Sequence, residues 1–312
     1  MDELDSIFSD DWGDDHRSGL VAVIGRPNVG KSTLINALLG QKVAIATPKP
    51  QTTRQRQLGI YTSADAQILF VDTPGIHKPH TLLGNYMQTV ARHALRDADV
   101  VLWIVDASSA PRKADRQIGD AIGQFARHTP LVLCLNKRDL CDKNFDDSSH
   151  LELSDTPQVV TTSATEPRGL EDLLDCLTPL LPFGPRYFPA EQVSEANMRF
   201  IAAEIIREKV IEFTSDEIPH SAAVEIEWFE ERPGISAIEA VIYVERESQK
   251  GIVIGKGGRM IKRIGVAARA ELQQTLETDV RLETRVKVLK NWRSNEDFMR
   301  RVGYALPKRK KA

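Results

Sequence analysis

The stretch that decides the fold is Gly25-Arg-Pro-Asn-Val-Gly-Lys-Ser32, which matches the phosphate-loop pattern G-x-x-x-x-G-K-S/T. It follows an apolar run that we expect to be a strand, and it precedes a helical pattern. In such a loop the glycines let backbone N–H groups turn toward phosphate oxygens, and the helix N-terminus adds positive potential. Lys31 is then expected to reach the β- and γ-phosphates of a nucleotide, and the Ser32 hydroxyl to bind Mg²⁺. The alternative, a plain glycine-rich turn, is disfavoured by the strand before it and the helix after it.

Around this loop, apolar runs alternate with helical patterns as far as residue 180. Near-continuous Val, Ile and Leu runs separated by helices are typical of a parallel sheet that is covered on both faces. We therefore expect an α/β domain with a mostly parallel sheet. The predicted strands are residues 20–24, 66–72, 99–106, 130–136 and 158–163, and the predicted helices are residues 31–39, 82–98, 113–127 and 169–180.

The pattern changes after residues 181–189, which carry three prolines and a glycine and are typical of a linker. Beyond it the order helix–strand–strand–helix–helix–strand predicts a small α+β unit. The chain then divides into an acidic extension at 1–17, the α/β domain at 18–181, a linker at 182–194, the α+β domain at 195–290 and a basic tail at 291–312.

Two further motifs lie where a magnesium ion and a γ-phosphate would be held. Asp72-Thr-Pro-Gly75 ends an apolar run, so Asp72 can hold Mg²⁺ through water and the Gly75 N–H can contact the γ-phosphate. A plain strand-ending turn competes with this interpretation. Gln51-Thr-Thr-Arg54 lies between the first helix and the next strand, and a threonine there can complete the Mg²⁺ shell. We favour Thr53 over Thr52, with an ordinary polar loop as the alternative.

Base recognition is predicted from Asn136-Lys-Arg-Asp139, which ends another apolar run. The Asp139 carboxylate can accept hydrogen bonds from the N1–H and 2-amino groups of guanine, which adenine cannot donate. Lys137 is expected to lie along the base, with Asn136 bracing the loop. Thr162-Ser163-Ala164 can offer a backbone N–H to guanine O6, a weak signal by itself. These motifs, in this order at strand ends, resemble the translation-factor-related GTPase domain.

The hydrolysis step lacks one expected side chain. Phosphoryl transfer to water needs an aligned water molecule and charge stabilisation. Ile76 stands where many such GTPases carry a glutamine, and it cannot orient water by hydrogen bonding. In relatives with this replacement, an asparagine in the phosphate loop can help bind K⁺. Asn28 is therefore a candidate K⁺ ligand or else a loop-bracing side chain, and we expect slow hydrolysis that K⁺ or a partner accelerates.

The predicted nucleotide site is gathered from these motifs. For GTP or GDP it comprises Gly25, Arg26, Pro27, Asn28, Val29, Gly30, Lys31, Ser32, Asp72, Thr73, Pro74, Gly75, Ile76, Asn136, Lys137, Arg138, Asp139, Ser163 and Ala164. Catalytic roles are expected for Lys31, Thr53, Asp72 and Gly75, and Mg²⁺ contacts for Ser32, Thr53 and Asp72.

The α+β unit carries a second motif, G-x-x-G at residues 255–258, which follows an apolar step and opens a helix. This resembles the type-2 KH domain, whose G-x-x-G loop clamps single-stranded RNA. Residues 246–269 hold seven basic residues and one acidic residue, so cations surround the loop. A tight turn on a solvated basic face is the alternative. The expected RNA contacts are Gly255, Lys256, Gly257, Gly258, Arg259, Lys262 and Arg263.

The net charge of the whole chain does not show how unevenly the charged residues are distributed. The chain has 41 Lys and Arg against 44 Asp and Glu, a net charge of −3 that by itself argues against a nucleic-acid binder. Residues 1–18 carry seven acidic side chains and one basic one, whereas residues 285–312 carry ten basic and two acidic ones. An acidic head and a basic end indicate an anionic partner for the C-terminal part, with a solvated face as the equal alternative.

Length and composition exclude other classes. With 312 residues and 41% hydrophobic content, the chain can bury two cores. No apolar run approaches the roughly 18 residues of a membrane helix, and the acidic start is the reverse of a signal peptide. Cys134, Cys141 and Cys176 form no Cys-x-x-Cys pair, which argues against a zinc ribbon or a disulfide framework and fits a reducing cytosol.

The pairing of the two domains resembles the bacterial Era family of GTPases over roughly residues 18–303. The resemblance implies GTP hydrolysis coupled to binding near the 3′ end of small-subunit 16S ribosomal RNA, in rRNA processing and 30S ribosomal subunit biogenesis. It also implies a cytoplasmic protein with peripheral contact at the inner membrane. We expect a monomer, because no coiled-coil seam is evident.

Two alternatives stay open. An RNA chaperone or scaffold that binds nucleotide structurally needs no turnover, and Ile76 favours it. A GTPase acting on another RNA, or at the membrane surface, is the other. The acidic extension and the tail at 307–312 depart from the family pattern and leave room for extra partners.

Overall fold

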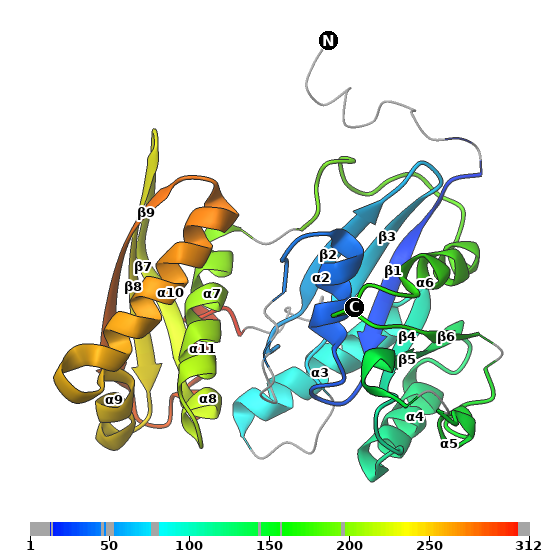
Figure 1. The fold of residues 1–312 in the computed structure, drawn as a ribbon, viewed down its shortest axis with the longest axis horizontal. Helices are drawn as coiled ribbons and strands as arrows, with labels where there is room; N and C mark the ends of the chain where they lie inside the picture. The colour runs from blue at the N-terminus through cyan, green and yellow to red at the C-terminus, as the bar shows by residue number, and fades with distance from the viewer. Residues whose placement is uncertain are drawn as a thin grey trace. The chain divides into compact units, whose positions relative to one another are not determined.

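The computed structural model describes residues 13, 15–44, 47, 53–75, 81–142, 145–156, 158–194 and 197–304. The chain divides into two compact units (Figure 1). Met1–Ala44, Thr53–Lys78 and Met87–Glu195 belong to the first, and Ile45–Thr52, Pro79–Tyr86 and Ala196–Ala312 to the second. The acidic extension up to residue 12 and the tail from residue 305 lie outside the described residues.

The first unit is built on a six-stranded sheet with the order β2-β3-β1-β4-β5-β6. Neighbouring strands are parallel, except that β2 pairs antiparallel with β3 at one edge. The mostly parallel α/β sheet is thus confirmed, although β2 was not among the predicted strands. The strands are β1 (Arg17–Ile24), β2 (Gln57–Thr62), β3 (Ala66–Asp72), β4 (Val100–Asp106), β5 (Leu131–Asn136) and β6 (Val159–Thr161).

Helices cover both faces of this sheet (Figure 1). Alternate residues of β1 point to opposite faces, because side chains alternate along a strand. Val21 and Val23 join the apolar cluster with α2 and α6, whereas Ala22 and Ile24 join the cluster with α3 and α4. The helices are α2 (Lys31–Leu39), α3 (Leu82–Asp97), α4 (Lys113–Phe125), α5 (Ser148–Leu151) and α6 (Leu170–Leu177), with 3-10 turns η1 (Arg138–Leu140) and η2 (Thr178–Leu180).

Residues 183–194, which we call the strap, are fastened to the first unit at both ends. Near its start, Phe183 forms a β-bridge with Arg17, whose guanidinium lies 3.9 Å from the centre of the Phe183 ring. At its end, Ser194 forms a β-bridge with Gly59 of the edge strand β2. The strap therefore runs from β1 to the free edge of β2.

One buried glutamine holds the middle of the strap. Gln67 of β3 has no exposed surface. Its Oε1 accepts hydrogen bonds from the backbone N–H groups of Tyr187 at 2.7 Å and Phe188 at 3.0 Å, and its Nε2 donates to the Phe188 carbonyl at 2.8 Å. Further along, the Ile60 N–H donates to the Val193 carbonyl at 2.9 Å. The strap is thus hydrogen-bonded to the sheet as an ordered element.

The second unit is the smaller α+β domain expected from the sequence. Its sheet has the order β7-β8-β9, with β7 and β8 antiparallel and β8 and β9 parallel. Helices α7 and α10 cover one face of the sheet (Figure 1). The elements are α7 (Met198–Phe213), α8 (Ile218–Ser221), β7 (Ala223–Arg232), β8 (Ile235–Val244), α9 (Glu247–Ile254), η3 (Lys256–Gly258), α10 (Arg259–Leu276), β9 (Asp279–Val288), η4 (Trp292–Ser294) and α11 (Glu296–Arg301).

The segment after β9 packs through Trp292. This side chain is fully buried, its Nε1 donates to the Ser221 carbonyl at 2.7 Å, and its ring stacks on Tyr304. Trp292 is therefore a packing residue of this unit. In the described part of the chain, every helix is too short or too polar to span a membrane.

Candidate functional site

The phosphate loop leads from the end of β1 into α2. Gly30 has φ +98°, and a Cβ there would lie 2.4 Å from the Asn136 amide nitrogen, so only glycine fits. Lys31 folds over the loop, and its Nζ donates to the carbonyls of Gly25 at 3.2 Å and Arg26 at 3.1 Å. Burial lowers the pKa of Lys31. A phosphate anion would stabilise this buried ammonium, so the loop is suited to a nucleotide.

Three oxygen-bearing side chains meet beside the loop. Ser32 Oγ and Thr53 Oγ1 donate to Asp72 Oδ2 at 2.6 and 3.2 Å. Burial raises the pKa of Asp72, and its Oδ1 has no hydrogen-bond partner among the described residues. Hydroxyl and carboxylate oxygens are ligands that Mg²⁺ prefers, so this cluster fits a Mg²⁺ ion. Thr53 thus lies where a magnesium ligand was expected, and Thr52 lies outside the described residues.

The turn after β3 lies against the phosphate loop. Thr73 Oγ1 donates to the Val23 carbonyl at 2.8 Å. A Cβ on Gly75 would come within 2.9 Å of Pro27, so the close approach of these two backbones requires glycine. The Gly75 N–H position is therefore beside the loop that would hold phosphates. Ile76 lies outside the described residues.

Asn136 joins the loop after β5 to the phosphate loop. Its Nδ2 donates to the Val29 carbonyl at 2.9 Å, and its Oδ1 accepts from Thr162 Oγ1 at 3.1 Å. All three residues are buried. Asn136 thus links the phosphate loop to the end of β6, beyond the bracing of its own loop that the sequence predicted.

The Asp139 carboxylate lies partly exposed at the rim of the same edge. It accepts hydrogen bonds from Ser163 Oγ at 2.6 Å and Thr165 Oγ1 at 3.2 Å. The Ser163 hydrogen bond lowers the pKa of Asp139, so the group is an anion at neutral pH. An orientated carboxylate can accept the two N–H groups of a guanine base. Arg138 points elsewhere, with its guanidinium 4.7 Å from the Phe145 ring centre.

The structure brings most of the predicted nucleotide residues to one edge, at the carboxyl ends of the parallel strands. These are Gly25, Arg26, Pro27, Asn28, Val29, Gly30, Lys31, Ser32, Thr53, Asp72, Thr73, Pro74, Gly75, Asn136, Lys137, Arg138, Asp139, Ser163 and Ala164. Sequence reasoning missed Asp106, which binds Lys137, and Asp115, which binds Arg26. Asp106 ends the apolar strand β4, as Asp72 ends β3, and this position was the available signal.

The second predicted site is the G-x-x-G loop between α9 and α10. Gly255, Gly257 and Gly258 have φ values of +71°, +61° and +74°, a backbone region that favours glycine. A Cβ on Gly255 would lie 2.7 Å from Met260, whereas Gly257 faces open space. The middle of the loop can therefore approach an extended phosphate backbone without steric hindrance.

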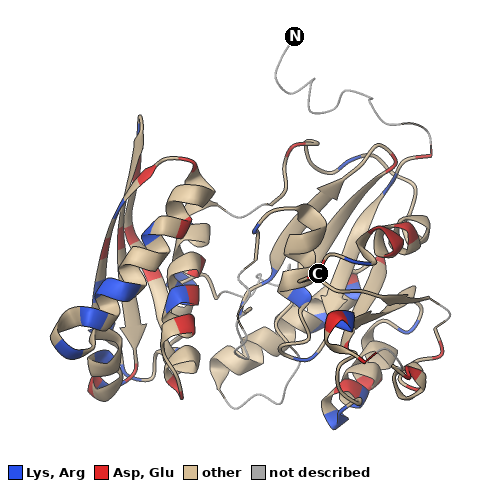
Figure 2. Ribbon diagram, viewed as in Figure 1, with Lys and Arg blue, Asp and Glu red and all other residues tan. Residues whose placement is uncertain are grey.

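Cations line the helix that follows this loop. Lys256, Arg259, Lys262 and Arg263 are all exposed, and the ribbon in Figure 2 is coloured blue for Lys and Arg at several places along α9 and α10. Arg263 is partly anchored, because its guanidinium lies 4.1 Å from the Phe213 ring centre. The arrangement can attract and hold a nucleic-acid backbone.

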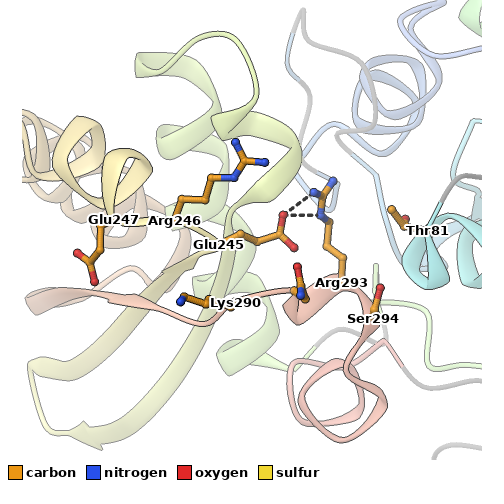
Figure 3. Close-up of a pocket in the computed structure, with 8 residues that line it drawn as sticks. Thr81, Glu245, Arg246, Glu247, Lys290, Arg293 and Ser294 are labelled. Atoms are coloured by element: carbon orange, nitrogen blue, oxygen red, sulfur yellow. Dashed lines mark hydrogen bonds and ion pairs between the residues drawn. The ribbon is translucent and has the colours of Figure 1, made fainter.

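A polar hollow lies beside α9 in the second unit (Figure 3). Arg246 and Lys290 contribute cations to its wall, and Glu245 is turned toward Arg293 and paired with it. Opposite charges are nearly balanced here, so the hollow lacks the charge excess seen at the G-x-x-G helix.

The fold and the two sites define a class. A mostly parallel sheet that carries a phosphate loop, a Mg²⁺-type oxygen cluster and a guanine-type carboxylate is a phosphate-loop GTPase domain, and here a KH domain follows it. Family models agree with both assignments. The model described as a 50S ribosome-binding GTPase matches residues 20–137, and that of the KH domain matches residues 217–293.

Individual relatives are similar over nearly the whole chain. GTPase Era of Lacticaseibacillus paracasei is 45% identical over 296 residues, which cover 93% of this chain and 97% of the relative. GTPase Era of Geobacter metallireducens is 45% identical over 293 residues, which cover 92% and 98%. The chain belongs to the Era family of GTPases.

Solved Era structures share the fold. A variant of Aquifex aeolicus Era bound to GDP and AlF4⁻ superposes with a TM-score of 0.86 at 38% identity, over 93% of this chain and all of the other. Era in complex with MgGDPNP and nucleotides 1506–1542 of 16S ribosomal RNA gives the same TM-score, identity and coverage. This protein is accordingly an enzyme that binds guanine nucleotides and hydrolyses GTP.

Proposed function

We propose that this GTPase is a molecular switch that binds 16S ribosomal RNA near its 3′ end and acts in rRNA processing and 30S subunit biogenesis. The observation that carries the proposal is a guanine-nucleotide site joined, in one Era-family chain, to an exposed and strongly basic G-x-x-G helix. A related Era structure holds MgGDPNP together with nucleotides 1506–1542 of 16S ribosomal RNA, which supports both the ligand class and the RNA region.

In this proposal the phosphate loop binds and orients the nucleotide. Lys31 contacts the β- and γ-phosphates, and Ser32, Thr53 and Asp72 hold Mg²⁺. The metal neutralises charge on the phosphate oxygens when it is bound. The Gly75 N–H lies beside Pro27 of the loop and donates to the γ-phosphate. Loss of that phosphate releases the loop that carries Thr53, as in other nucleotide switches.

Base choice rests on Asp139. The Asp139→Asn variant presents an amide that can donate to the 2-oxo group of xanthine, so preference should move from GTP toward xanthosine triphosphate. Competition binding with the two nucleotides measures the change. Unchanged preference for GTP would remove Asp139 from the base site.

Water activation is assigned to a monovalent cation, because Ile76 offers no hydrogen bond. Asn28 has φ +66° and an exposed side chain in the phosphate loop, where it is accessible to a K⁺ ion beside the phosphates. Turnover should therefore be faster in KCl than in NaCl, and the Asn28→Ala variant should lose this difference. Equal turnover in both salts for the unmodified protein would eliminate the cation.

RNA binding is assigned to the G-x-x-G loop and can be tested with a matched pair of variants. Gly257 and Gly234 both have positive φ, and a Cβ at either meets nothing within 4 Å. Gly257→Asp adds an anion at the loop, whereas Gly234→Asp adds the same anion and the same backbone strain in the β7–β8 turn. With an RNA of nucleotides 1506–1542, only Gly257→Asp should weaken binding, by at least tenfold in fluorescence anisotropy. Equal loss in both variants would contradict the assignment.

The switch itself requires different RNA affinities in the two nucleotide states. Anisotropy with GDP and with a non-hydrolysable GTP analogue at matched salt measures that difference. Equal affinities would leave a scaffold that binds nucleotide structurally, and such a protein would still support 30S assembly when carrying Lys31→Ala.

A further inference from the structure

The last residue of β4, Asp106, joins the two loops that make up the nucleotide site. Its Oδ2 accepts a hydrogen bond from Lys137 Nζ at 2.8 Å and lies 3.7 Å from Arg26 Nη2. Its Oδ1 accepts from the N–H of Ser108 at 3.1 Å and the Ser108 hydroxyl at 2.6 Å. One carboxylate therefore touches the guanine-type loop through Lys137 and the phosphate loop through Arg26.

Arg26 is fixed from a second direction. Its Nε donates to Asp115 Oδ2 at 3.2 Å, and the same oxygen accepts the N–H of Arg112 at 2.8 Å. Asp115 is 1% exposed, and the Arg26 side chain is 10% exposed. The Arg26 carbonyl, in turn, accepts a hydrogen bond from Lys31. Contacts thus run without a break from Lys137 to the phosphate-binding lysine.

The hydrogen bond that holds the Lys137 side chain bears on nucleotide affinity. The Lys137 backbone adopts φ +66°, and its ammonium reaches Asp106 across the end of the sheet. A free lysine side chain has one of the largest rotamer entropies of any residue, and a ligand that orders it loses affinity. Because Asp106 already holds Nζ, that ordering takes place during folding and not when the nucleotide binds.

The electrostatic environment supports a charged Asp106. Burial opposes ionisation, but the hydrogen bonds from Lys137 and Ser108 outweigh it and lower the pKa of Asp106 below its usual range. The carboxylate is 11% exposed and the Lys137 side chain 28% exposed, so solvent screens the pair only in part. A plain surface ion pair would have neither this burial nor four contacts to one carboxylate.

We propose that Asp106 is a positioning residue for guanine-nucleotide binding, which holds Lys137 and Arg26 so that the base loop and the phosphate loop meet the nucleotide as one preformed site. The inference rests on the proposed role of Lys137 beside the base. It assigns Asp106 an effect on affinity and none on the hydrolysis step, because its side-chain contacts are with Lys137, Arg26 and Ser108 and not with Asp72 or Gly75.

The test compares Asp106→Asn with Asp120→Asn, the same isosteric change at an exposed site on α4. Asp106→Asn should weaken GDP binding about tenfold in calorimetry, while turnover at saturating GTP stays within about twofold. Asp120→Asn should change neither. In a Lys137→Met background, Asp106→Asn should weaken GDP binding by less than about twofold, because the partner is already gone.

Thermal unfolding without nucleotide shows whether each variant is folded. If Asp106→Asn does not fold, Ser108→Ala tests the same carboxylate more gently, since it removes the 2.6 Å hydrogen bond, and should weaken GDP binding about threefold. Unchanged affinity in a folded Asp106→Asn, or a full tenfold loss in the Lys137→Met background, would overturn the inference. Failure of the base assignment is distinguishable, because it would appear in Asp139→Asn as unchanged GTP preference.

Discussion

The strongest prediction concerns Gln67→Leu, which removes the hydrogen bonds that hold the strap without leaving a cavity. Three backbone groups of the strap lose their partner: the N–H groups of Tyr187 and Phe188 and the Phe188 carbonyl. An unpaired buried group costs about 1–3 kcal/mol. These groups are partly buried, so we take the lower figure for each, about 3 kcal/mol in all. Leucine fills a similar volume, which keeps the packing term small.

A loss of this size is measurable. For a domain of this length the thermal midpoint falls by about 2–4 °C per kcal/mol, so the variant should melt about 6–12 °C lower. The strap should also open locally, which exposes Arg186 to trypsin. We therefore expect faster cleavage after Arg186 under native conditions, followed by mass spectrometry.

The matched control is Gln124→Leu, at an exposed position of α4. It should leave the midpoint within about 1 °C and the tryptic rate unchanged, because this side chain is exposed to solvent. The reasoning would be refuted if Gln67→Leu melted within about 1 °C of the unmodified protein and was cleaved after Arg186 no faster. Such a result would mean that water replaces the side chain at no cost.

Two other predictions concern buried ionisable groups. Burial raises the folded-state pKa of Asp72, so its ionisation costs stability. That cost is absent below the unfolded pKa, near 3.8, grows as the pH rises from there toward the folded pKa, and is complete above the folded pKa. Asp72→Asn should therefore raise the thermal midpoint of the nucleotide-free protein at about pH 7 and not at about pH 4. A gain of equal size at both pH values in calorimetry would contradict this pH dependence. The same variant should abolish Mg²⁺-dependent turnover. Burial raises the pKa of Cys134 to about 12, so iodoacetamide should modify the partly exposed Cys141 well before Cys134 in the folded protein. Mass spectrometry of the labelled peptides would show equal rates if the Cys134 thiol were accessible.

The strand-end chemistry was predictable because its signals are local. Asp72 and Asp139 each follow an apolar run closely, and the carboxyl ends of parallel strands meet at one edge of a sheet. Position along the chain therefore implied position in space. The sequence predicted that Asn136 braces its own loop, and its hydrogen bond to the Val29 carbonyl of the phosphate loop is a contact that the structure adds.

The remaining features depend on partners far away in the chain. β2 pairs on one side with β3 and on the other with the strap, and the Gly59–Ser194 bridge leaves no local pattern. Asp106 had the same strand-end signal as Asp72, but its partners come from two different loops. Only the assembled sheet shows that one carboxylate reaches both.

The strap determines where the chain can be truncated to give a GTPase fragment with a covered sheet edge. A fragment that ends at residue 181, where the helical pattern stops, would remove the strap partners of Gln67 and leave the Ile60 N–H without its acceptor. The outer edge of β2 would then be open to pairing with another chain, which is a common start of aggregation. A GTPase fragment that continues through Ser194 keeps that edge covered. The segment between the domains thus also covers the edge strand of the sheet and keeps it from pairing with another chain.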